Sequence, residues 1–462
     1  MLEGARYRFE PLERGGLVLG LSAAQVAVLA SAALVALGLL SGGHGADGAV
    51  GALGVIGLGA LLCRPVAGKP LMSWLALGAR FLARPRSAAQ APPGLALARP
   101  QFAMAKLLAP GLKLVELEAR LGPSALGVLL DERYGTAAAL LRARGAAFCL
   151  LDEQGKQQRL ASWASVLESL TSQSGSLARL QWCQRNLPGD NGPLLRRLEE
   201  AGDPGSPSYQ DHVGLVEAAK SWRHETLLVV AVRWHGSLGK RGQNGLEVLL
   251  NEVTSLRSQL RGAGFACEPA LDAAGIAAAV GAFLGPVRRC HPGAYQWPLV
   301  TDEHWSALRV DGLWHRTYWV AEWPRSHVGP DFLSPLLLSE GSRAFSVVMA
   351  PVPPERAARE AESSRVAQLA DSQLRSQGGF LETARQRRKA EALESREALL
   401  ADGRGAFELA GYVTISASDE AGLDKAGAQL ERAASAARLC LRCLYGQQKE
   451  ALAWAMPFGR GV

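Results

Sequence analysis

The chain has 462 residues, a formal net charge of +7 and 48% hydrophobic residues, which is too long for one simple core and indicates two or three folded units. The positive charge permits contact with nucleic acid or an anionic membrane but does not define a fold. Its seven cysteines are odd in number and widely spaced, which excludes the dense disulfide framework of a small secreted domain and indicates a reducing compartment for most of the chain.

Two apolar runs open the chain. The first, residues 17–40, has 24 residues without a charge, and as a helix it would extend about 36 Å against a hydrocarbon core of about 30 Å. The second, residues 49–63, is shorter but rich in glycine, and small residues let membrane helices approach closely. A polar turn joins the runs. Residues 1–86 are therefore predicted to form a transmembrane hairpin, with a buried soluble helix as the alternative for the first run.

Basic residues flank both ends of this hairpin. Arg6, Arg8 and Arg14 precede the first run, Arg64 follows the second, and the turn between the runs contains no Lys or Arg. The positive-inside rule then predicts a plasma (inner) membrane protein with two spans, whose ends and main body are cytoplasmic. The stretch that follows the second run, up to Arg86, fits either an amphipathic helix that contacts anionic lipid headgroups or an ordinary linker helix.

An α+β body is predicted after the hairpin. A connector rich in Pro and Ala, residues 87–100, leads to a first small α+β lobe, residues 101–190, with three strand-like runs in an antiparallel meander, a helix and a further strand. The polar residues 191–220 are predicted to be a linker.

A second α+β lobe is predicted for residues 221–353. Its strand, helix, strand, helix, strand pattern suggests a ferredoxin-like arrangement with helices on one face of an antiparallel or mixed sheet. Residues 354–403 are charged and interrupted by two glycines, which predicts a charged helical hairpin. Residues 404–462 are expected to supply the closing strand and helix of the second lobe.

The motifs for catalysis and cofactor binding are incomplete. The run GSLGKRGQNG, residues 236–245, lacks the first P-loop glycine and the Ser or Thr after its lysine. Cys440 and Cys443 are predicted to lie inside a helix without a second cysteine pair, whereas a structural zinc needs four ligands. The acids and histidines between His291 and His315 match no known catalytic spacing. We therefore expect no enzyme activity, no metal and no cofactor.

The run DGLWHRTYWVAEWPR, residues 311–325, is unusually aromatic and is predicted to be a central strand. The face expected to pack under helices contains Leu313, His315, Thr317, Trp319, Ala321 and Trp323. Trp314, Arg316 and Tyr318 on the opposite face form a candidate contact surface. Arg387 and Arg388, from the densest basic run, are a second candidate, although nearby glutamates favour a solvated helix face.

Several longer stretches resemble a known family. They are YRFEPLERGGLVLGLSAAQVAVLA, WPLVTDEHW, VVMAPVPPERAARE and LYGQQKEALAWAMPFGRG, and together they resemble actinobacterial membrane proteins associated with conjugation-like, type IV secretion clusters. More distantly, the start of the chain resembles the small two-span membrane partner of the conjugation ATPase. The body resembles the N-terminal, non-catalytic domain of that ATPase.

This resemblance implies a non-catalytic anchor and docking subunit of a conjugation-like secretion or DNA-transfer machine. The implied partners are channel membrane proteins and a separate P-loop ATPase, and the implied assembly is a homo-oligomeric ring. The alternative is a membrane-tethered nucleic-acid-binding protein that presents DNA to the channel. The sequence favours the first, because no stripe of Lys and Arg interleaves with aromatic residues.

Overall fold

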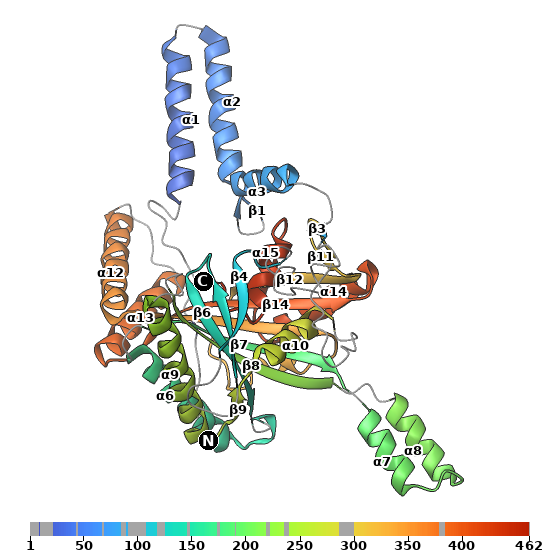
Figure 1. Ribbon diagram of the computed structural model, residues 1–462. Helices are drawn as coiled ribbons and strands as arrows, with labels where there is room; N and C mark the ends of the chain where they lie inside the picture. The colour runs from blue at the N-terminus through green and yellow to red at the C-terminus, as the bar shows by residue number, and fades with distance from the viewer. Residues whose placement is uncertain are drawn as a thin grey trace. The chain divides into compact units, whose positions relative to one another are not determined.

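The computed structural model describes residues 9, 22–42, 45–66, 69–84, 89–90, 108–117, 125–145, 148–172, 176–189, 191–218, 222–234, 240–285, 300–377 and 384–461 (Figure 1). The chain divides into two compact units. The smaller unit is Pro11–Ser87, and the larger combines Met1–Glu10 with Ala88–Val462.

The smaller unit is built on a helical hairpin, as predicted, of α1 (Ala23–Ser41) and α2 (Gly45–Cys63). Both helices are long and apolar enough to cross a membrane. Ser22 begins α1 because its side chain accepts a hydrogen bond from the amide of Gln25 in a capping box. A Cβ at Gly59 would lie 3.0 Å from the Cβ of Ala32, so the glycine permits the close approach of the two helices.

A short amphipathic helix follows the hairpin. The strands β1 (Pro65–Val66) and β2 (Lys69–Pro70) form a tight antiparallel turn. Helix α3 (Leu71–Ala83) then runs across the axis of the α1–α2 hairpin (Figure 1).

The larger unit is organised by one antiparallel sheet, to which the described residues contribute 13 strands. The strands are β3 (Ala89–Gln90), β4 (Leu112–Leu117), β5 (Leu126–Asp131), β6 (Thr136–Arg144), β7 (Leu177–Pro188), β8 (Trp222–Arg233), β9 (Ala266–Ala270), β10 (Val300–Glu303), β11 (Leu308–Val310), β12 (Leu313–Glu322), β13 (Arg343–Val352), β14 (Ala406–Ala417) and β15 (Cys440–Cys443). Their order is β3-β10-β11-β12-β14-β13-β7-β8-β6-β5-β4, with β15 on β12 and β9 on β6.

Helices connect and cover these strands. They are the 3-10 turn η1 (Phe148–Leu150), α6 (Glu153–Ser172), α7 (Gly192–Ala201), α8 (Pro207–Ala218), α9 (Lys240–Gly262), α10 (Ala273–Leu284), α11 (Ser334–Leu337), α12 (Pro354–Gln377), α13 (Ala384–Ala401), α14 (Glu420–Ala436) and α15 (Gln448–Ala455). The meander β4-β5-β6, α6, α9, β13 and the α12–α13 hairpin agree with the sequence predictions.

The larger unit contains an internal repeat that the sequence analysis missed. The first copy runs β4, β5, β6, α6, β7, helical hairpin α7–α8, β8, α9, β9, α10. The second copy runs β10, β11, β12, α11, β13, helical hairpin α12–α13, β14, α14, β15, α15. In each copy a helical hairpin connects the two central strands, β7 to β8 and β13 to β14. The last strand of each copy pairs with the third strand on the same edge as the second strand. Thus β9 and β5 both pair with β6, and β15 and β11 both pair with β12. The copies join where β7 pairs with β13 in antiparallel register, Cys183 opposite Ser346.

This arrangement corrects the predicted division of the body. Residues 101–190 and 221–353 do not form separate sheets, because β7 pairs with both β8 and β13. Helices α7 and α8 occupy most of the predicted linker 191–220, in the place that α12 and α13 take in the second copy. The natural boundary between the copies falls between α10 and β10.

Helices cover both faces of the sheet, which corrects the prediction of helices on one face. Alternating residues of β6 point to opposite sides, so Ala139 packs in the cluster with α6 and α9 whereas Leu140 packs in the cluster with α10. In the second copy α14 packs against Val413, and α15 packs on the other side against Tyr412.

The segment after α15 fastens the two copies together. The Gln181 side chain of β7 donates to Met456 O at 2.9 Å and accepts from Gly459 N at 2.7 Å. Arg460 then reaches β5, where its guanidinium pairs with Asp131 at 2.5 Å. Only 3% of Arg460 and 1% of Asp131 is exposed, so this is a buried ion pair between the second copy and the first.

Replacing Arg460 with Met should destabilise the body, because it leaves the Asp131 carboxylate buried without its partner. Breaking such a pair costs about 3–5 kcal/mol of unfolding free energy. The matched control is Lys113→Met, which breaks the exposed Lys113–Glu132 pair and should cost about 1 kcal/mol or less. Thermal and denaturant unfolding of the purified protein in detergent measures both. Equal losses for the two variants would show that the buried pair does not fasten the copies.

Candidate interaction sites

The predicted contact face of β12 is largely covered by α14. Tyr318 is only 4% exposed, and a Cβ at Gly427 of α14 would lie 2.9 Å from the Tyr318 hydroxyl oxygen, so the glycine lets the helix approach this ring. Arg316 donates to Asp424 Oδ1 on α14 at 2.8 Å and to Ser306 O at 3.0 Å. Arg316 and Tyr318 therefore hold α14 to the sheet. Replacing Arg316 with Ala is expected to weaken the packing of α14 and to lower the stability of the fold.

The other face of β12 is buried as predicted at His315 and Thr317, which are both 0% exposed. Gln448, near the start of α15, accepts from Thr317 N at 2.8 Å and donates to Thr317 O at 3.2 Å. The Thr317 hydroxyl lies 2.9 Å from that of Thr414 on β14. This polar cluster fixes α15 to the sheet.

Trp323 lies on the opposite side from the one that strict alternation predicts. The pairing of β12 with β15 shifts between Val320 and Glu322, and such a bulge changes which face later residues occupy. Trp323 consequently packs with Tyr318 and Val320, whereas Trp319 packs in the cluster near α15.

Trp314 belongs to an exposed aromatic patch, which we define as His304, Trp305, Arg309, Trp314 and Tyr445. The His304 and Trp314 ring centroids are 4.8 Å apart, and Arg309 Cζ lies 5.8 Å from the Trp314 centroid. Trp305 and Tyr445 stack at 6.3 Å with an interplanar angle of 20°. Trp305 is 38% exposed and Tyr445 37% exposed, and His304 is also exposed, whereas Trp314 is half-buried and packs partly against the core.

This aromatic patch is chemically suited to bind another protein. Trp, Tyr and Arg are the residues most enriched among those that dominate the energy of protein interfaces. Backbone bonds hold the patch in place, since Gly446 N donates to Trp305 O at 2.7 Å and His304 N to Ala307 O at 2.8 Å. The acidic Asp302 lies 3.2 Å from His304, which makes the site less favourable for a phosphate.

Sequence reasoning identified Trp314 but missed the other members of the patch as a contact surface. His304 was grouped with His291, Asp311 and His315 as a weak catalytic candidate. The structure separates these residues, because His315 is buried, Asp311 accepts from Val300 N at 2.8 Å, and His291 lies outside the described residues. The signal for the patch was the pair of aromatic residues next to chain turns, Trp305 and Tyr445.

The second predicted contact surface lies on α13. Arg387 is exposed there, and the Arg388 side chain lies outside the described residues. The neighbouring α12 and α13 carry acid–base pairs, including Arg365 with Glu397 at 2.6 Å. The role of Arg387 and Arg388 as a contact surface stays a prediction.

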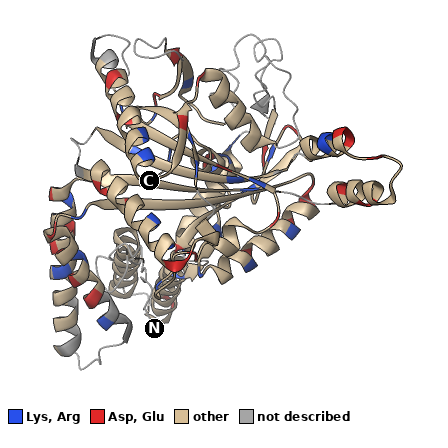
Figure 2. Cartoon of the chain, turned by 90° about the horizontal axis from the view of Figure 1, so that it is seen from below, with Lys and Arg blue, Asp and Glu red and all other residues tan. Residues whose placement is uncertain are grey.

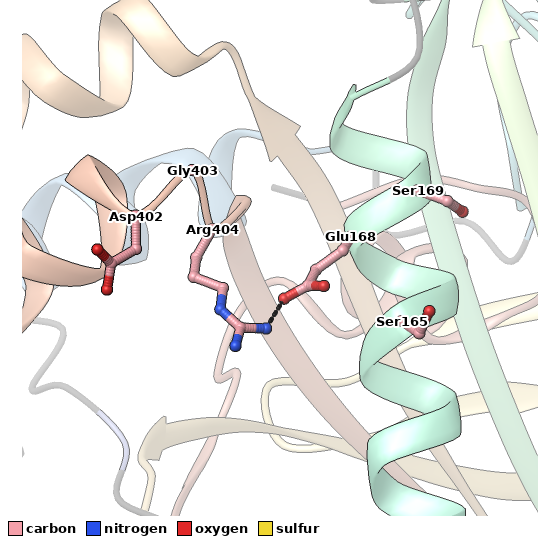
Figure 3. Close-up of a pocket in the computed structure, with 6 residues that line it drawn as sticks. All are labelled: Ser165, Glu168, Ser169, Asp402, Gly403 and Arg404. Atoms are coloured by element: carbon pink, nitrogen blue, oxygen red, sulfur yellow. Dashed lines mark hydrogen bonds and ion pairs between the residues drawn. The ribbon is translucent and has the colours of Figure 1, made fainter.

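A polar hollow lies between α6 and the turn after α13 (Figure 3). An ion pair between Arg404 and Glu168 crosses it, and Ser165, Ser169 and Asp402 complete the lining. These charges bind each other, and Glu168 and Arg404 are both well exposed. The hollow thus joins α13 to the first copy and offers no enclosed volume for a ligand.

The cysteine pair near the end of the chain lies on a strand, β15, and not in a helix as predicted. Arg438 adopts a left-handed φ of 57° after α14, which ends the helix and returns the chain to pair with β12. Burial raises the pKa of Cys443 to about 12, so its thiol stays protonated at neutral pH. Among the described residues, no group of three or more His, Cys, Asp or Glu is placed to hold a metal ion.

Phe9, which precedes α1, packs in the body. Its ring stacks on Trp323 with centroids 5.2 Å apart and contacts Phe332 at 5.5 Å. Its amide donates to Pro324 O at 3.4 Å. The chain before the first candidate span and the chain after the second therefore meet in one folded unit.

Two candidate spans and a body with an exposed aromatic patch define the class, a membrane protein with a large domain suited to docking. Residues 224–320 match the family model described as "Putative type VII ESX secretion system translocon, EccE". The matched segment begins in β8 and ends in β12, so it bridges the two copies and includes four residues of the aromatic patch. No curated protein matches the chain.

The match overturns the resemblance drawn from the sequence. The stretches that suggested conjugation-like, type IV clusters and the conjugation ATPase indicated a secretion-system membrane protein, whereas the family model that matches residues 224–320 describes a type VII system. The reason for the error is that Trp-Pro and Gly-Gln-Gln elements pack a sheet against helices, as Gln448 does at Thr317. Packing elements carry no information about the transported cargo.

His315 should make stability depend on pH. Burial lowers its pKa to about 4, whereas an exposed histidine titrates near about 6.5. As the pH falls from about 6.5 towards 4, the unfolded chain binds a proton at this site and the folded chain does not, so stability decreases by about 3 kcal/mol. At higher pH the contribution is fully retained.

Unfolding of the wild type and of His315→Gln across this pH range measures the effect. The glutamine variant has no group that titrates at this position, so its stability should fall less steeply with acid. Parallel pH profiles for the two proteins would contradict the buried, neutral histidine.

Proposed function

We propose that this chain is a non-catalytic membrane subunit of a type VII secretion translocon, which docks other subunits through the aromatic patch. The observation that carries the proposal is the family match over residues 224–320. Because these residues join the two copies of the repeat, the similarity concerns the centre of the body and not a peripheral module.

The hairpin supports a membrane location with both ends on one side. Phe9 packs against Trp323, so residues on either side of the two spans share a folded unit and an even number of crossings separates them. The basic residues that flank the hairpin favour the cytoplasmic side. We therefore assign the body to the cytoplasmic face of the inner membrane.

The expected partners are other membrane proteins of the translocon and a separate motor ATPase. Aromatic rings with an adjacent arginine favour a protein partner, because they supply apolar contact area at low conformational cost. A symmetric assembly with further copies of this chain remains part of the proposal.

The nucleic-acid alternative has little support from the charge distribution. Basic and acidic positions lie interspersed along the described helices (Figure 2), and Arg356 and Arg365 are paired with glutamates. Phosphate tracking requires a basic groove with aromatic platforms. The family match also removes the argument from DNA transfer.

Affinity purification from native membranes in mild detergent tests the proposal. The wild-type chain should recover other type VII membrane subunits, and the Trp305→Ala/Tyr445→Ala variant should recover at least about tenfold less, because residues of this kind contribute about 2 kcal/mol each at an interface centre. Mass spectrometry measures the recovered proteins.

The control is Leu150→Ala, since Leu150 is 86% exposed and lies outside the patch. It should recover the same subunits as the wild type. If the wild type recovers no type VII subunit, the function is wrong. If the patch variant recovers as much as the wild type, the function stands and the docking site is wrong.

A further inference from the structure

We propose that α3 is an anionic-lipid-binding helix, which lies in the headgroup layer with the exposed Leu75 and Leu82 towards the acyl chains and with Arg80 towards the phosphates. The proposal concerns a lipid site and is independent of which secretion machine the chain serves. It rests on the position of α3 after the second span, its two faces and its charge.

The structure fixes where α3 begins. Helix α2 ends at Cys63 and the charged Arg64 follows. Strands β1 and β2 turn the chain back, so that Leu71 N donates to Arg64 O at 3.1 Å. Trp74 Nε1 also donates to Val66 O at 2.8 Å. The first turn of α3 is therefore held beside the residue at which the apolar span ends, which is the depth of the headgroups if α2 crosses the bilayer.

The two faces of α3 match such an interface. Leu75 is 59% and Leu82 63% exposed, and seven residues apart they lie on one side of the helix. Arg80 is exposed and lies about half a turn away from both leucines. Exposed leucines beside a membrane span are favourable only where lipid covers them, and a helix with these faces lies in the plane of the membrane surface. In Figure 1 α3 runs across the axis of the α1–α2 hairpin.

The charge around α3 selects anionic lipid. Residues 48–86 contain five Lys and Arg and no Asp or Glu. Each basic residue near an anionic leaflet adds to the attraction, which decays within a Debye length of about 10 Å. Phosphatidylglycerol is the simplest probe, because it has a phosphate with a negative charge.

Hydrogen–deuterium exchange of the full chain in nanodiscs tests the proposal. Nanodiscs of phosphatidylcholine alone are compared with nanodiscs that also contain phosphatidylglycerol. The amides of α3 should exchange at least about tenfold more slowly with phosphatidylglycerol, and high salt should remove part of this difference. The amides of β7 and β13 should not differ between the lipids.

Two double variants separate lipid binding from a general loss of charge. Arg64→Glu/Arg80→Glu should abolish the lipid-dependent protection of α3. Arg233→Glu/Arg359→Glu, which makes the same charge change at exposed positions of the body, should retain it. Equal exchange of α3 in both kinds of nanodisc would overturn the proposal, as would protection that appears only when other secretion subunits are bound.

Discussion

The body depends on the central pairing of β7 with β13. Each strand belongs to a different copy of the repeat, and their antiparallel register turns two half-sheets into one. The segment after α15 closes this junction on one side, with Gln181 bound to Met456 O and Gly459 N and with Arg460 bound to Asp131. Because these polar groups are buried, they must all be satisfied, and their geometry specifies one alignment of the two copies.

Each copy of the repeat supplies helices to both faces of the sheet and also one helical hairpin that connects its two central strands. In each copy a hairpin leaves between the two central strands, α7–α8 in the first copy and α12–α13 in the second. In the second copy the β10–β11 turn carries His304 and Trp305 of the aromatic patch. A duplicated scaffold thus carries the aromatic patch in its second copy, and four of the five patch residues lie within the segment that matches the type VII family model.

Much of the fold could be predicted from local patterns. The apolar length of α1, the alternation in β12 and the helical spacing in α9 depend on neighbouring residues, so the sequence reveals them. The order of the strands could not be predicted, because β7 and β13 meet only in the folded sheet. Cys183 lies opposite Ser346, which is 163 residues later in the chain. The face of Trp323 depended on a bulge, and the end of α14 depended on the positive φ of Arg438.

The candidate site was predicted only in part, for a related reason. Trp314 is aromatic and near the start of a strand, but its neighbours His304 and Arg309 come from the β10–β11 turn and from β11, which meet β12 only in the folded sheet. Arg316 and Tyr318 looked equally available in the alternation, yet α14 covers them because Gly427 permits a close approach. Burial on the second face of a strand is a property of the whole fold.

The most direct test of the account is photo-crosslinking in living cells from position 305, with position 150 as the exposed control. A photoreactive phenylalanine derivative in place of Trp305 should form an adduct with another membrane subunit of the type VII translocon, and the same group in place of Leu150 should not. Identification of the adduct by mass spectrometry gives the partner. Adducts with nucleic acid, or the same yield from both positions, would contradict a translocon subunit that docks through its aromatic patch.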